Sequence, residues 1–436
     1  MSGDLLTGEV TDLNADAQGV MRIDGKVVFV RDALPGETIS FQLRRRKRRH
    51  DEAILEEVLS PADNRVTPRC DAYGTCGGCS LQHLSEDAQR DYKQQLLLNN
   101  LQHIGGVTPE EIATPLADPA WGYRRRARLG VKYVDKKGRV LVGFRERDKP
   151  YIADMAACHV LIPEIGLQLD RLVACIETLD LRSRLPQIEV AGGDNGVALV
   201  LRILDPLSQA DRARLEKLAR DSGWWLYLQP GDLGTVKPLN PQTPTLAYQL
   251  PNFDVSLQFE PTDFIQVNGA LNRLMVDQAM EWLAPQAGDT ALELFAGLGN
   301  FSLPLARLGT ALTTVEGEAS LVQRASENAA RNGLAGITTF VDDLYRQDAD
   351  LTRSNWARQR YRLALIDPPR SGAREALPAL AAAGVERLLY VSCHPGTLAR
   401  DAGLLVKEYG FRLRRAGMLD MFPHTRHAEG MALFER

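Results

Sequence analysis

Short stretches with alternating apolar and polar residues fill the first sixty positions of the chain. Such alternation predicts β-strands with one buried face, and the Asp24-Gly25 pair predicts a tight hairpin turn between two of them. Four or five short strands within about sixty residues are typical of a small barrel of the oligonucleotide-binding kind. The expected strands lie within 8–14, 19–32, 37–46 and 51–59.

The pattern of the next two hundred residues or so is mixed. A helix is expected after an irregular stretch rich in glycine and proline, and alternating segments then predict two hairpins with a second helix between them. This order favours an α/β region. The helices are expected at Ser85–Ile104, with Ser85 as N-cap, and at Ile165–Leu179, and the hairpin turns at Lys137-Gly138 and Asp194-Asn195.

From residue 262 onward, apolar strands alternate with helices. This alternation is typical of a doubly wound parallel sheet, the Rossmann-like arrangement. In such sheets ligands bind outside the carboxyl ends of the strands, so the loops that follow the strands should carry the chemistry. We expect three domains, a small barrel at 1–62, a central domain at 63–260 and a doubly wound domain at 261–436.

Length and composition indicate a multidomain globular protein. The 436 residues are 44% apolar and 25% charged, and no apolar run reaches the ~18 residues that a membrane span requires. The first residues lack a basic, apolar secretion signal. We therefore expect a cytoplasmic protein with no membrane partner.

Positive charge is concentrated in two places, although the net charge is -4. Arg44–Arg49 is an unbroken cationic run, and residues 121–150 contain eleven Lys or Arg against three Asp or Glu. Such clusters on an acidic chain indicate a phosphate-contacting surface, with solvated charged faces as the alternative. Tyr123 stands beside arginines in the second cluster, a combination that suits stacking and phosphate contact in single-stranded RNA.

A glycine-rich turn follows the first expected strand of the last domain. The sequence ELFAGLGNFS (Glu293–Ser302) ends a strand, turns at two glycines and begins a helix, but it lacks the third glycine of a dinucleotide motif. The next strand ends in Glu316, whose carboxylate can accept both hydroxyls of a ribose. The two features predict a site for an adenosine-containing cofactor, with a merely structural turn as the alternative.

Three further places near strand ends carry reactive groups. Asp367 opens a rigid Asp-Pro-Pro-Arg loop, Cys393 follows an apolar run, and Glu429 lies in a histidine-rich string. An Asp-Pro-Pro loop is also familiar in enzymes that methylate amino nitrogens, but there an aromatic residue follows, where this chain has Arg370. A lone cysteine in such a place is more often a buried small apolar side chain.

A thiolate and a base beside a methyl donor suit one reaction in particular. Pyrimidine C5 is not nucleophilic enough to attack a sulfonium methyl unaided. A thiolate that adds at C6 makes C5 enolate-like, and covalent catalysis of this kind divides one hard step into two. The C5 proton must then leave to a base within hydrogen-bond reach. Cys393 and Glu429 supply these two roles.

Four other cysteines suggest a metal or cluster site. Cys70, Cys76 and Cys79 lie close together in the irregular stretch, and Cys158 is distant in sequence. Four thiolates can hold zinc or an iron–sulfur cluster, and the spacing alone does not decide between them. The spacing found in radical enzymes that use S-adenosylmethionine is absent.

Several motifs together resemble the S-adenosylmethionine-dependent RNA uracil-C5 methyltransferase family. They follow the family's order and span nearly the whole chain, and the pattern SCxPxTLARD is highly specific. The first sixty residues resemble the TRAM RNA-binding module, and Gly122–Tyr133 follows the family's basic central strand. The motifs are FEPTDFIQVN, ELFAGLGNFSLPLA, VEG, DPPRSG, YVSCHPGTLARD and PHTRHAEG.

The leading barrel and the cysteine cluster make the chain more similar to the ribosomal branch of the family, which acts on 23S rRNA. We expect the transfer RNA members to lack both features. Three positions depart from the family pattern. His394 stands where asparagine is usual after the nucleophile, Ala296 replaces a common cysteine, and Asp343, next to Asp342, occupies a place often held by asparagine.

The resemblance implies a role for each matching residue. Cys393 would be the nucleophile and Glu429 the base that removes the C5 proton. The four clustered cysteines would bind a [4Fe-4S] cluster that serves folding and RNA positioning and has no redox part in methyl transfer. The S-adenosylmethionine contacts would be Gln266, Phe295, Asn300, Glu316, Asp343 and Asp367, and the cluster ligands Cys70, Cys76, Cys79 and Cys158.

We therefore expect a monomeric enzyme that methylates C5 of a specific uridine in 23S rRNA and forms 5-methyluridine. A uracil attacked at C6 cannot remain stacked, so the target should lie in a single strand or loop and flip out. One alternative is an amino-group methyltransferase built on the Asp-Pro-Pro-Arg loop, which needs no thiolate. The other is a non-catalytic RNA-binding or assembly factor.

Overall fold

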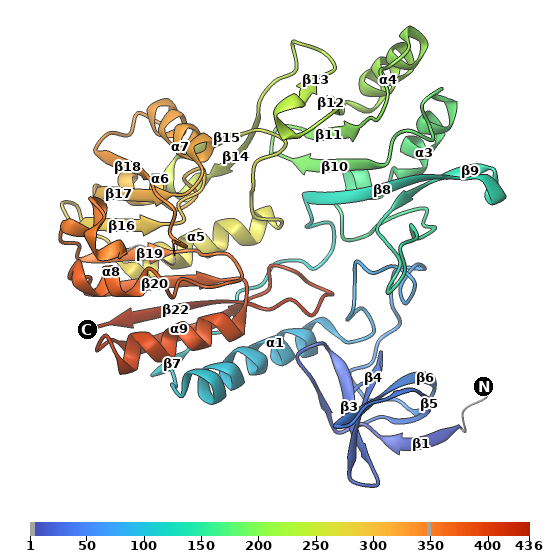
Figure 1. The fold of residues 1–436 in the computed structure, drawn as a ribbon, viewed down its shortest axis with the longest axis horizontal. Coiled ribbons are helices and arrows are strands. Elements are labelled where there is room, and N and C mark those ends of the chain that lie inside the picture. Colours follow the sequence, from blue (N-terminus) through green and yellow to red (C-terminus); the bar gives the residue numbers. More distant parts are fainter. Residues whose placement is uncertain (1–4, 347–349) are drawn as a thin grey trace.

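The computed structural model of the chain describes residues 5–346 and 350–436 (Figure 1). These residues form three sheets of six, six and eight strands and one two-stranded ribbon. Within the described ranges, no helix is long and apolar enough to cross a membrane.

The N-terminal sheet consists of β1 (Leu6–Glu9), β2 (Asp12–Leu13), β3 (Gln18–Ile23), β4 (Lys26–Arg31), β5 (Thr38–Arg46) and β6 (His50–Ser60). Its order is β1-β5-β6-β4-β3-β2, one strand more than the sequence predicted. The hairpin expected at Asp24-Gly25 is confirmed, because it joins β3 to β4 and both turn residues have positive φ. Alternate side chains such as Val30 and Phe41 fill a small core of their own.

One helix, α1 (Glu86–Asn100), and a π-helical turn, η1 (Leu101–Gly105), connect this sheet to the rest. The sequence predicted a single helix there. Ser85 precedes α1 as expected, but its side chain makes no capping hydrogen bond. The π turn brings Gly105 close to a neighbouring helix: a Cβ at this position would lie 2.5 Å from the carbonyl oxygen of Ala399.

The central sheet has the order β13-β12-β11-β10-β8-β9. The hairpins expected at Lys137-Gly138 and Asp194-Asn195 are confirmed. The helix predicted from Ile165 is interrupted, because Gly166 packs so closely on the Cys158 carbonyl that a Cβ would lie 2.2 Å from it. The elements are β8 (Arg126–Val134), η2 (Asp135–Lys137), β9 (Arg139–Gly143), α2 (Pro163–Gly166), α3 (Leu169–Thr178), β10 (Gln187–Gly192), β11 (Val197–Arg202), α4 (Gln209–Ser222), β12 (Trp225–Gln229), η3 (Leu233–Thr235) and β13 (Lys237–Pro238).

The C-terminal sheet has the order β18-β17-β16-β19-β20-β22-β21-β7, and a two-stranded ribbon precedes it in the chain. Its first five strands are parallel, as predicted, but β22 runs antiparallel to both β20 and β21, so the sheet is mixed, which the sequence did not predict. The strands are β7 (Glu111–Ile112), β14 (Leu246–Leu250) and β15 (Val255–Phe259) of the ribbon, β16 (Thr290–Leu294), β17 (Ala311–Glu316), β18 (Ile337–Val341), β19 (Leu363–Ile366), β20 (Arg387–Ser392), β21 (Arg412–Leu419) and β22 (Glu429–Glu435).

Helices cover both faces of this sheet (Figure 1), which is why its central strands, such as β19 and β20, are largely apolar. One buried cluster joins the sheet to α1, α8 and α9, and another joins it to α5, α6 and the ribbon. The helices and short turns are η4 (Pro251–Phe253), α5 (Gly269–Leu283), α6 (Ser302–Arg307), α7 (Ala319–Arg331), η5 (Leu351–Arg353), η6 (Trp356–Arg358), α8 (Leu377–Ala382) and α9 (Pro395–Lys407).

Candidate active site at the carboxyl edge of the C-terminal sheet

The three reactive side chains singled out from the sequence come from neighbouring strands. Asp367 directly follows β19, Cys393 directly follows β20, and Glu429 is the first residue of β22. Ser392 pairs with Gly430 in the antiparallel register of β20 and β22, so Cys393 and Glu429 occupy the next positions along these two strands. The reversed strand therefore brings a carboxyl group from the C-terminal string to the thiol.

Burial raises the pKa of all three groups, and repulsion from neighbouring negative charges raises those of Glu429 and Cys393 further. Burial raises the pKa of Asp367 to about 7. It raises the pKa of Glu429 to about 8, with a further rise from Asp367, while the cations Lys93 and Arg370 act in the opposite direction. The pKa of Cys393 rises to about 11 through burial, then through the charges of Glu429 and Asp367, and Arg370 lowers it. The three groups are therefore close enough to interact electrostatically.

Residues of the TLARD motif hold the loop between β19 and α8 in place. Asp401 is fully buried, and its carboxylate accepts hydrogen bonds from the Ala373 amide (2.8 Å) and the Tyr390 hydroxyl (2.7 Å). Arg400 donates to the Ser371 carbonyl at 2.8 Å. This support holds the Asp-Pro-Pro-Arg loop at the sheet edge, where Arg370 acts on both the thiol and the carboxyl group.

His394, which stands in place of the usual asparagine, caps α9. Its Nδ1 accepts a hydrogen bond from the Thr397 amide at 3.2 Å, which satisfies one of the unpaired amides at the start of the helix. An asparagine oxygen can do the same, so the cap survives the replacement. The side chain is exposed and takes no other part in the site.

The glycine turn after β16 lies next to the end of β17. Phe295, Gly297 and Gly299 all have positive φ, and a Cβ at Gly299 would lie 2.4 Å from Leu303, so the tight turn requires glycine there. The Gly297 amide donates to one carboxylate oxygen of Glu316 at 3.0 Å. The hydrogen bond thus joins the turn to the acidic end of the next strand.

The remaining predicted cofactor residues lie around this turn to different degrees. Gln266 reaches Asp367, with 3.5 Å between its Nε2 and Oδ2 of the acid. Asn300 is held by hydrogen bonds of 2.9 Å with Tyr248 and Asn272. Asp343 is exposed and accepts a hydrogen bond from the Tyr345 amide, whereas the carboxylate of the neighbouring Asp342 bonds Ser354 and Trp356.

Sequence reasoning missed Tyr345. Its ring lies 5.6 Å from that of Phe295, centroid to centroid, and its hydroxyl is buried. Burial raises its pKa, and the negative charges of Glu375, Cys393 and Glu316 contribute to the rise, so the tyrosine lies near both the thiol and the acidic end of β17. No periodic pattern or motif distinguishes it in the sequence.

The four clustered cysteines line one small pocket between the irregular segment and the central domain. Burial raises the pKa of Cys79 to about 12 and that of Cys158 to about 11, and the other thiolates of the set add to both. The Gly78 amide donates to Cys76 Sγ at 3.4 Å. Among the residues that the structure describes, no group of three or more His, Cys, Asp or Glu side chains is arranged to hold a single metal ion.

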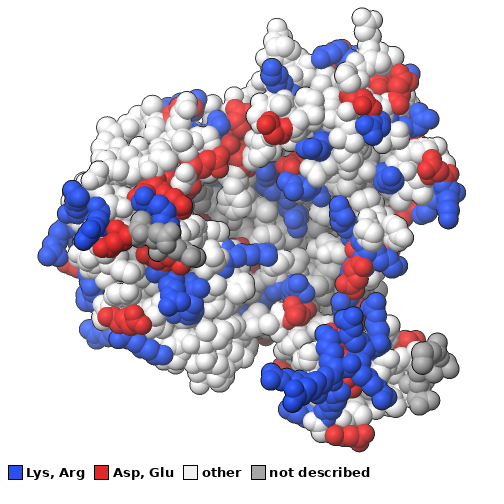
Figure 2. Space-filling view, in the orientation of Figure 1, with Lys and Arg blue, Asp and Glu red and all other residues white. Residues whose placement is uncertain are grey.

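A cleft of about 810 Å³ runs between the N-terminal sheet, the central sheet and the active-site loops. Figure 2 shows positive charge on the N-terminal sheet and in the hollow at the centre of this face. Two crossed ion pairs, Arg31–Asp148 and Arg147–Asp32, join the sheet to the central domain at one side of the cleft. Basic lining residues are Arg31, Arg124, Arg145, Arg147, Arg370 and Arg426.

The mixed sheet, with a glycine turn after its first parallel strand, defines the class of protein: a S-adenosylmethionine-dependent methyltransferase. A family model described as tRNA (Uracil-5-)-methyltransferase matches residues 245–436. A protein of Stenotrophomonas maltophilia named "23S rRNA (uracil(1939)-C(5))-methyltransferase RlmD" is 48% identical, over 98% of this chain and 96% of its own length. A protein of the same name from Alkalilimnicola ehrlichii is 49% identical with the same coverage. The chain therefore belongs to the RNA uracil-C5 methyltransferase family.

A solved structure has the same overall fold. It is the tRNA (uracil-54, C5)-methyltransferase of Pyrococcus abyssi in complex with S-adenosyl-L-homocysteine, with a TM-score of 0.74 and 21% identity. It covers 98% of this chain and 100% of its own. The N-terminal region thus has a counterpart in a transfer RNA enzyme, and the expectation that such members lack it is wrong.

Proposed function

We propose that the protein methylates C5 of a specific uridine in 23S rRNA and forms 5-methyluridine. The observation that carries the proposal is the adjacency of Cys393 and Glu429 on antiparallel strands beside Asp367 and the cofactor turn. The rRNA substrate rests on relatives about half identical over almost the whole chain, which are named for that activity. An amino-group methyltransferase would have no use for a thiol at this place.

The residues at the sheet edge can perform each step of the reaction. The Cys393 thiolate forms a bond to C6 of the uracil, and the C5–C6 π electrons move toward O4, so that C5 becomes nucleophilic. Bound S-adenosylmethionine supplies the methyl group that C5 takes up. Glu429 then accepts the C5 proton, the C5–C6 double bond re-forms, and the C6–S bond breaks to return the thiolate.

The raised pKa values of Cys393 and Glu429 determine the protonation state in which each group starts the reaction. With a pKa of about 11 the thiol is protonated at neutral pH, and Arg370, which lies on the substrate side, is the cation that favours the thiolate. With a pKa of about 8, Glu429 holds its proton below that pH in the substrate-free protein. A base that is poised near the operating pH suits proton abstraction.

The cofactor would lie along the turn after β16. Glu316 at the end of β17 would accept the ribose hydroxyls, and Phe295 would contact the adenine face of the site. Gln266 and Asp367, which already contact each other, would lie at the methyl-donor end, near Cys393. Asn300 and Asp343 complete the proposed contact set.

The four clustered cysteines fit a [4Fe-4S] cluster. Without a bound cluster, thiols such as Cys79 and Cys158, whose pKa values are raised, hold their protons tightly. A cluster that binds them as thiolates compensates the free-energy cost of ionising them. Their pocket adjoins the cleft through Cys79. We infer a role in folding and in placing the cleft wall, and zinc is the alternative that iron analysis decides. The ligands would be Cys70, Cys76, Cys79 and Cys158.

The RNA would lie in the cleft and reach the thiol as a flipped uridine. Residues 1–62 would act as a TRAM barrel, residues 63–260 as the cluster-bearing domain and residues 261–436 as the methyltransferase domain of a monomer. The arginines that line the cleft suit phosphate contacts, and they extend from the N-terminal sheet to Arg370 at the active-site loop.

Methyl transfer from labelled S-adenosylmethionine to 23S rRNA and to bulk tRNA tests the proposal. We expect label at C5 of one uridine in 23S rRNA and none in tRNA. Glu429→Gln should retain a covalent protein–RNA adduct, and Cys393→Ser in the same background should form none. Label on an amino nitrogen, or on tRNA alone, would refute the proposal.

A further inference from the structure

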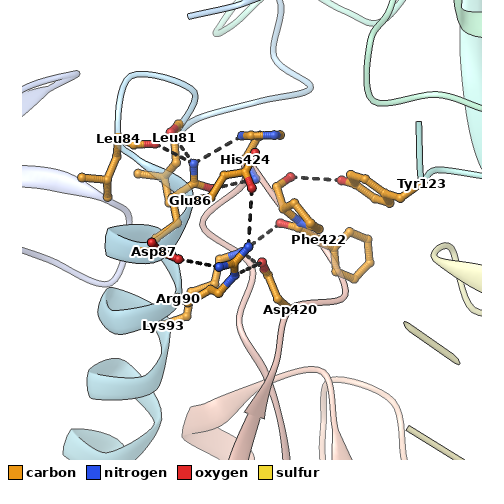
Figure 3. Close-up of polar contacts among 12 residues, drawn as sticks. Leu81, Leu84, Glu86, Asp87, Arg90, Lys93, Tyr123, Asp420, Phe422 and His424 are labelled. Atoms are coloured by element: carbon orange, nitrogen blue, oxygen red, sulfur yellow. Dashed lines mark hydrogen bonds and ion pairs between the residues drawn. The ribbon is translucent and has the colours of Figure 1, made fainter. Parts of the chain in front are cut away.

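A lysine of α1 is buried among polar partners that include Asp420 and Phe422 (Figure 3). Lys93 has no exposed surface, and its ammonium donates to Asp420 Oδ1 at 2.6 Å and to the Phe422 carbonyl at 2.9 Å. Asp420 is 2% exposed. Lysine is among the residues least often buried, and a buried charge is tolerated only with a partner. A pair so costly to bury calls for an explanation.

Both acceptors of Lys93 lie in the segment that leads to Glu429. Residues 420–428 connect β21 to β22, and Glu429 is the residue that follows. Two other residues of α1 anchor this part of the chain: Gln89 bonds the connection itself, and Gln94 bonds β21 just before it. Gln89 accepts a hydrogen bond from the His424 amide at 2.8 Å, and Gln94 accepts one from the Met418 amide at 3.0 Å.

The same helix also contacts the residue on the other side of Glu429. A Cβ at Gly430 would lie 3.0 Å from Leu97 Cδ2, so the missing side chain allows α1 to approach the strand. Gln89, Lys93 and Leu97 are spaced four apart and form one stripe of the helix. Glu429 is therefore fixed from both sides by one helix face.

We propose that Lys93 is a positioning residue for the reaction: through its buried ion pair with Asp420 it holds the 420–428 connection and so sets Glu429 opposite Cys393. The inference rests on the proposed function, because it assigns Lys93 a role only if Glu429 is the base. It also connects the helix that follows the cysteine segment directly to the proposed base.

The charge of Lys93 reaches Glu429 as well as Asp420. The groups that act on Glu429 are Asp367 from the loop after β19, Arg370 from the same loop, Cys393 from the end of β20 and Lys93 from α1. Of the two cations, Arg370 is exposed and Lys93 is fully buried, so Lys93 is the one that water screens less. On its other side, Lys93 faces Asp420 and Arg90.

Lys93→Met, which keeps the length and removes the charge, tests the inference. Glu429 must be ionised to accept the C5 proton, and loss of a neighbouring cation favours its protonated form. The pH midpoint of adduct resolution should therefore move upward by roughly one unit or more, with about a tenfold loss of rate per unit at neutral pH. Adduct should accumulate at pH 7 and resolve when the pH is raised.

Two variants separate the charge from packing. Lys93→Arg keeps the cation and should restore much of the original midpoint. Gln94→Leu removes another anchor of the same helix without removing a charge, and should lower stability with no shift of the midpoint. If Lys93→Met does not fold, Lys93→Met with Asp420→Asn removes both buried charges and should show the same upward shift.

The outcomes distinguish this inference from the proposed function. If Glu429→Gln fails to retain an adduct, the base is misassigned and the proposed function falls with it. If Glu429→Gln retains adduct while the Lys93 variants resolve it with an unchanged midpoint, only the role of Lys93 is refuted. An equal shift in Gln94→Leu would also refute it.

Discussion

Two clusters of titratable groups, the active-site edge and the cysteine pocket, are built in opposite ways. The active-site edge takes Asp367, Cys393 and Glu429 from the ends of adjacent strands, where sheet register fixes their spacing. The cysteine pocket takes its four thiols from an irregular segment and a distant loop, with no strand to fix them. In both, burial and the repulsion of neighbouring negative charges raise pKa values, as at Cys393 in the first and Cys79 in the second.

The two clusters differ in which groups compensate their negative charge. At the active-site edge two cations, Lys93 and Arg370, come from the protein itself and favour the ionised base. In the cysteine pocket the thiols mainly face one another, which suits a bound cationic cluster better than free thiolates. We therefore expect the cysteine pocket, and not the active-site edge, to depend on a bound cluster for its stability.

The largest effect should come from the thiol at the active-site edge. We expect Cys393→Ala to lower methyl transfer by at least about a thousandfold, because no other group can activate C5. Iron content and the thermal unfolding midpoint should not change. Methyl transfer assays with 23S rRNA measure the loss of activity. Retained activity would contradict the assignment of the reaction to the active-site edge.

Glu429→Gln should lower turnover by about a hundredfold or more, in line with the loss of a general base. Formation of the adduct should persist, so the variant separates the two halves of the reaction. Gel analysis under denaturing conditions with labelled RNA detects the adduct. A variant that turns over normally would show that another base removes the proton.

A cysteine-pocket variant should behave in the reverse manner. Cys79→Ser should lose iron and visible absorption after anaerobic purification, and its unfolding midpoint should fall by several degrees, because binding free energy of the cluster is folding free energy. Cys175→Ser, which changes a cysteine outside the pocket, is the matched control. Zinc without iron in the unaltered protein would overturn the cluster assignment.

Neutralising the basic run should affect binding more than chemistry. Replacement of Arg44, Arg45, Arg48 and Arg49 by Gln removes contacts that are far from the thiol, and we expect weaker RNA binding with a shallower salt dependence. Turnover at saturating RNA should be nearly unchanged. An unaltered salt slope, measured by filter binding, would show that this run is only a solvated surface.

The smallest expected effect is on stability and concerns Glu293, a buried acid under the cofactor turn. Burial raises its pKa from 4.5 to about 8, and Ser302 donates to it. The folded state therefore keeps a proton that the unfolded state loses between these pH values, so the free energy of unfolding falls as pH rises through this window. Glu293→Gln should flatten this dependence by about 1 kcal/mol or more between pH 5 and 8, measured by urea unfolding.

The sequence could predict most of the active-site edge because its members sit at strand ends. Asp367, Cys393 and Glu316 follow apolar runs, and the periodicity that predicts the strands also predicts that their carboxyl ends meet. Glu429 was predicted from its motif alone. Its placement depends on β22 running backwards, and local hydropathy does not reveal strand direction.

Other parts could not be predicted because they depend on contacts between distant segments. Lys93 and Asp420 are 327 positions apart, and a lysine in an amphipathic helix ordinarily faces water. Tyr345 likewise stands out only in the folded structure, where its ring lies beside that of Phe295. The break after Gly166 arises from a backbone contact with Cys158, which helix propensity does not include.

The most direct test of the central claim is the mapping of 5-methyluridine in ribosomal and transfer RNA from cells without the protein and from cells that express Cys393→Ala. We expect one 5-methyluridine to be lost from 23S rRNA in both, to return with the unaltered protein, and transfer RNA to keep its own. An unchanged 23S pattern, or a loss confined to transfer RNA, would contradict the assignment.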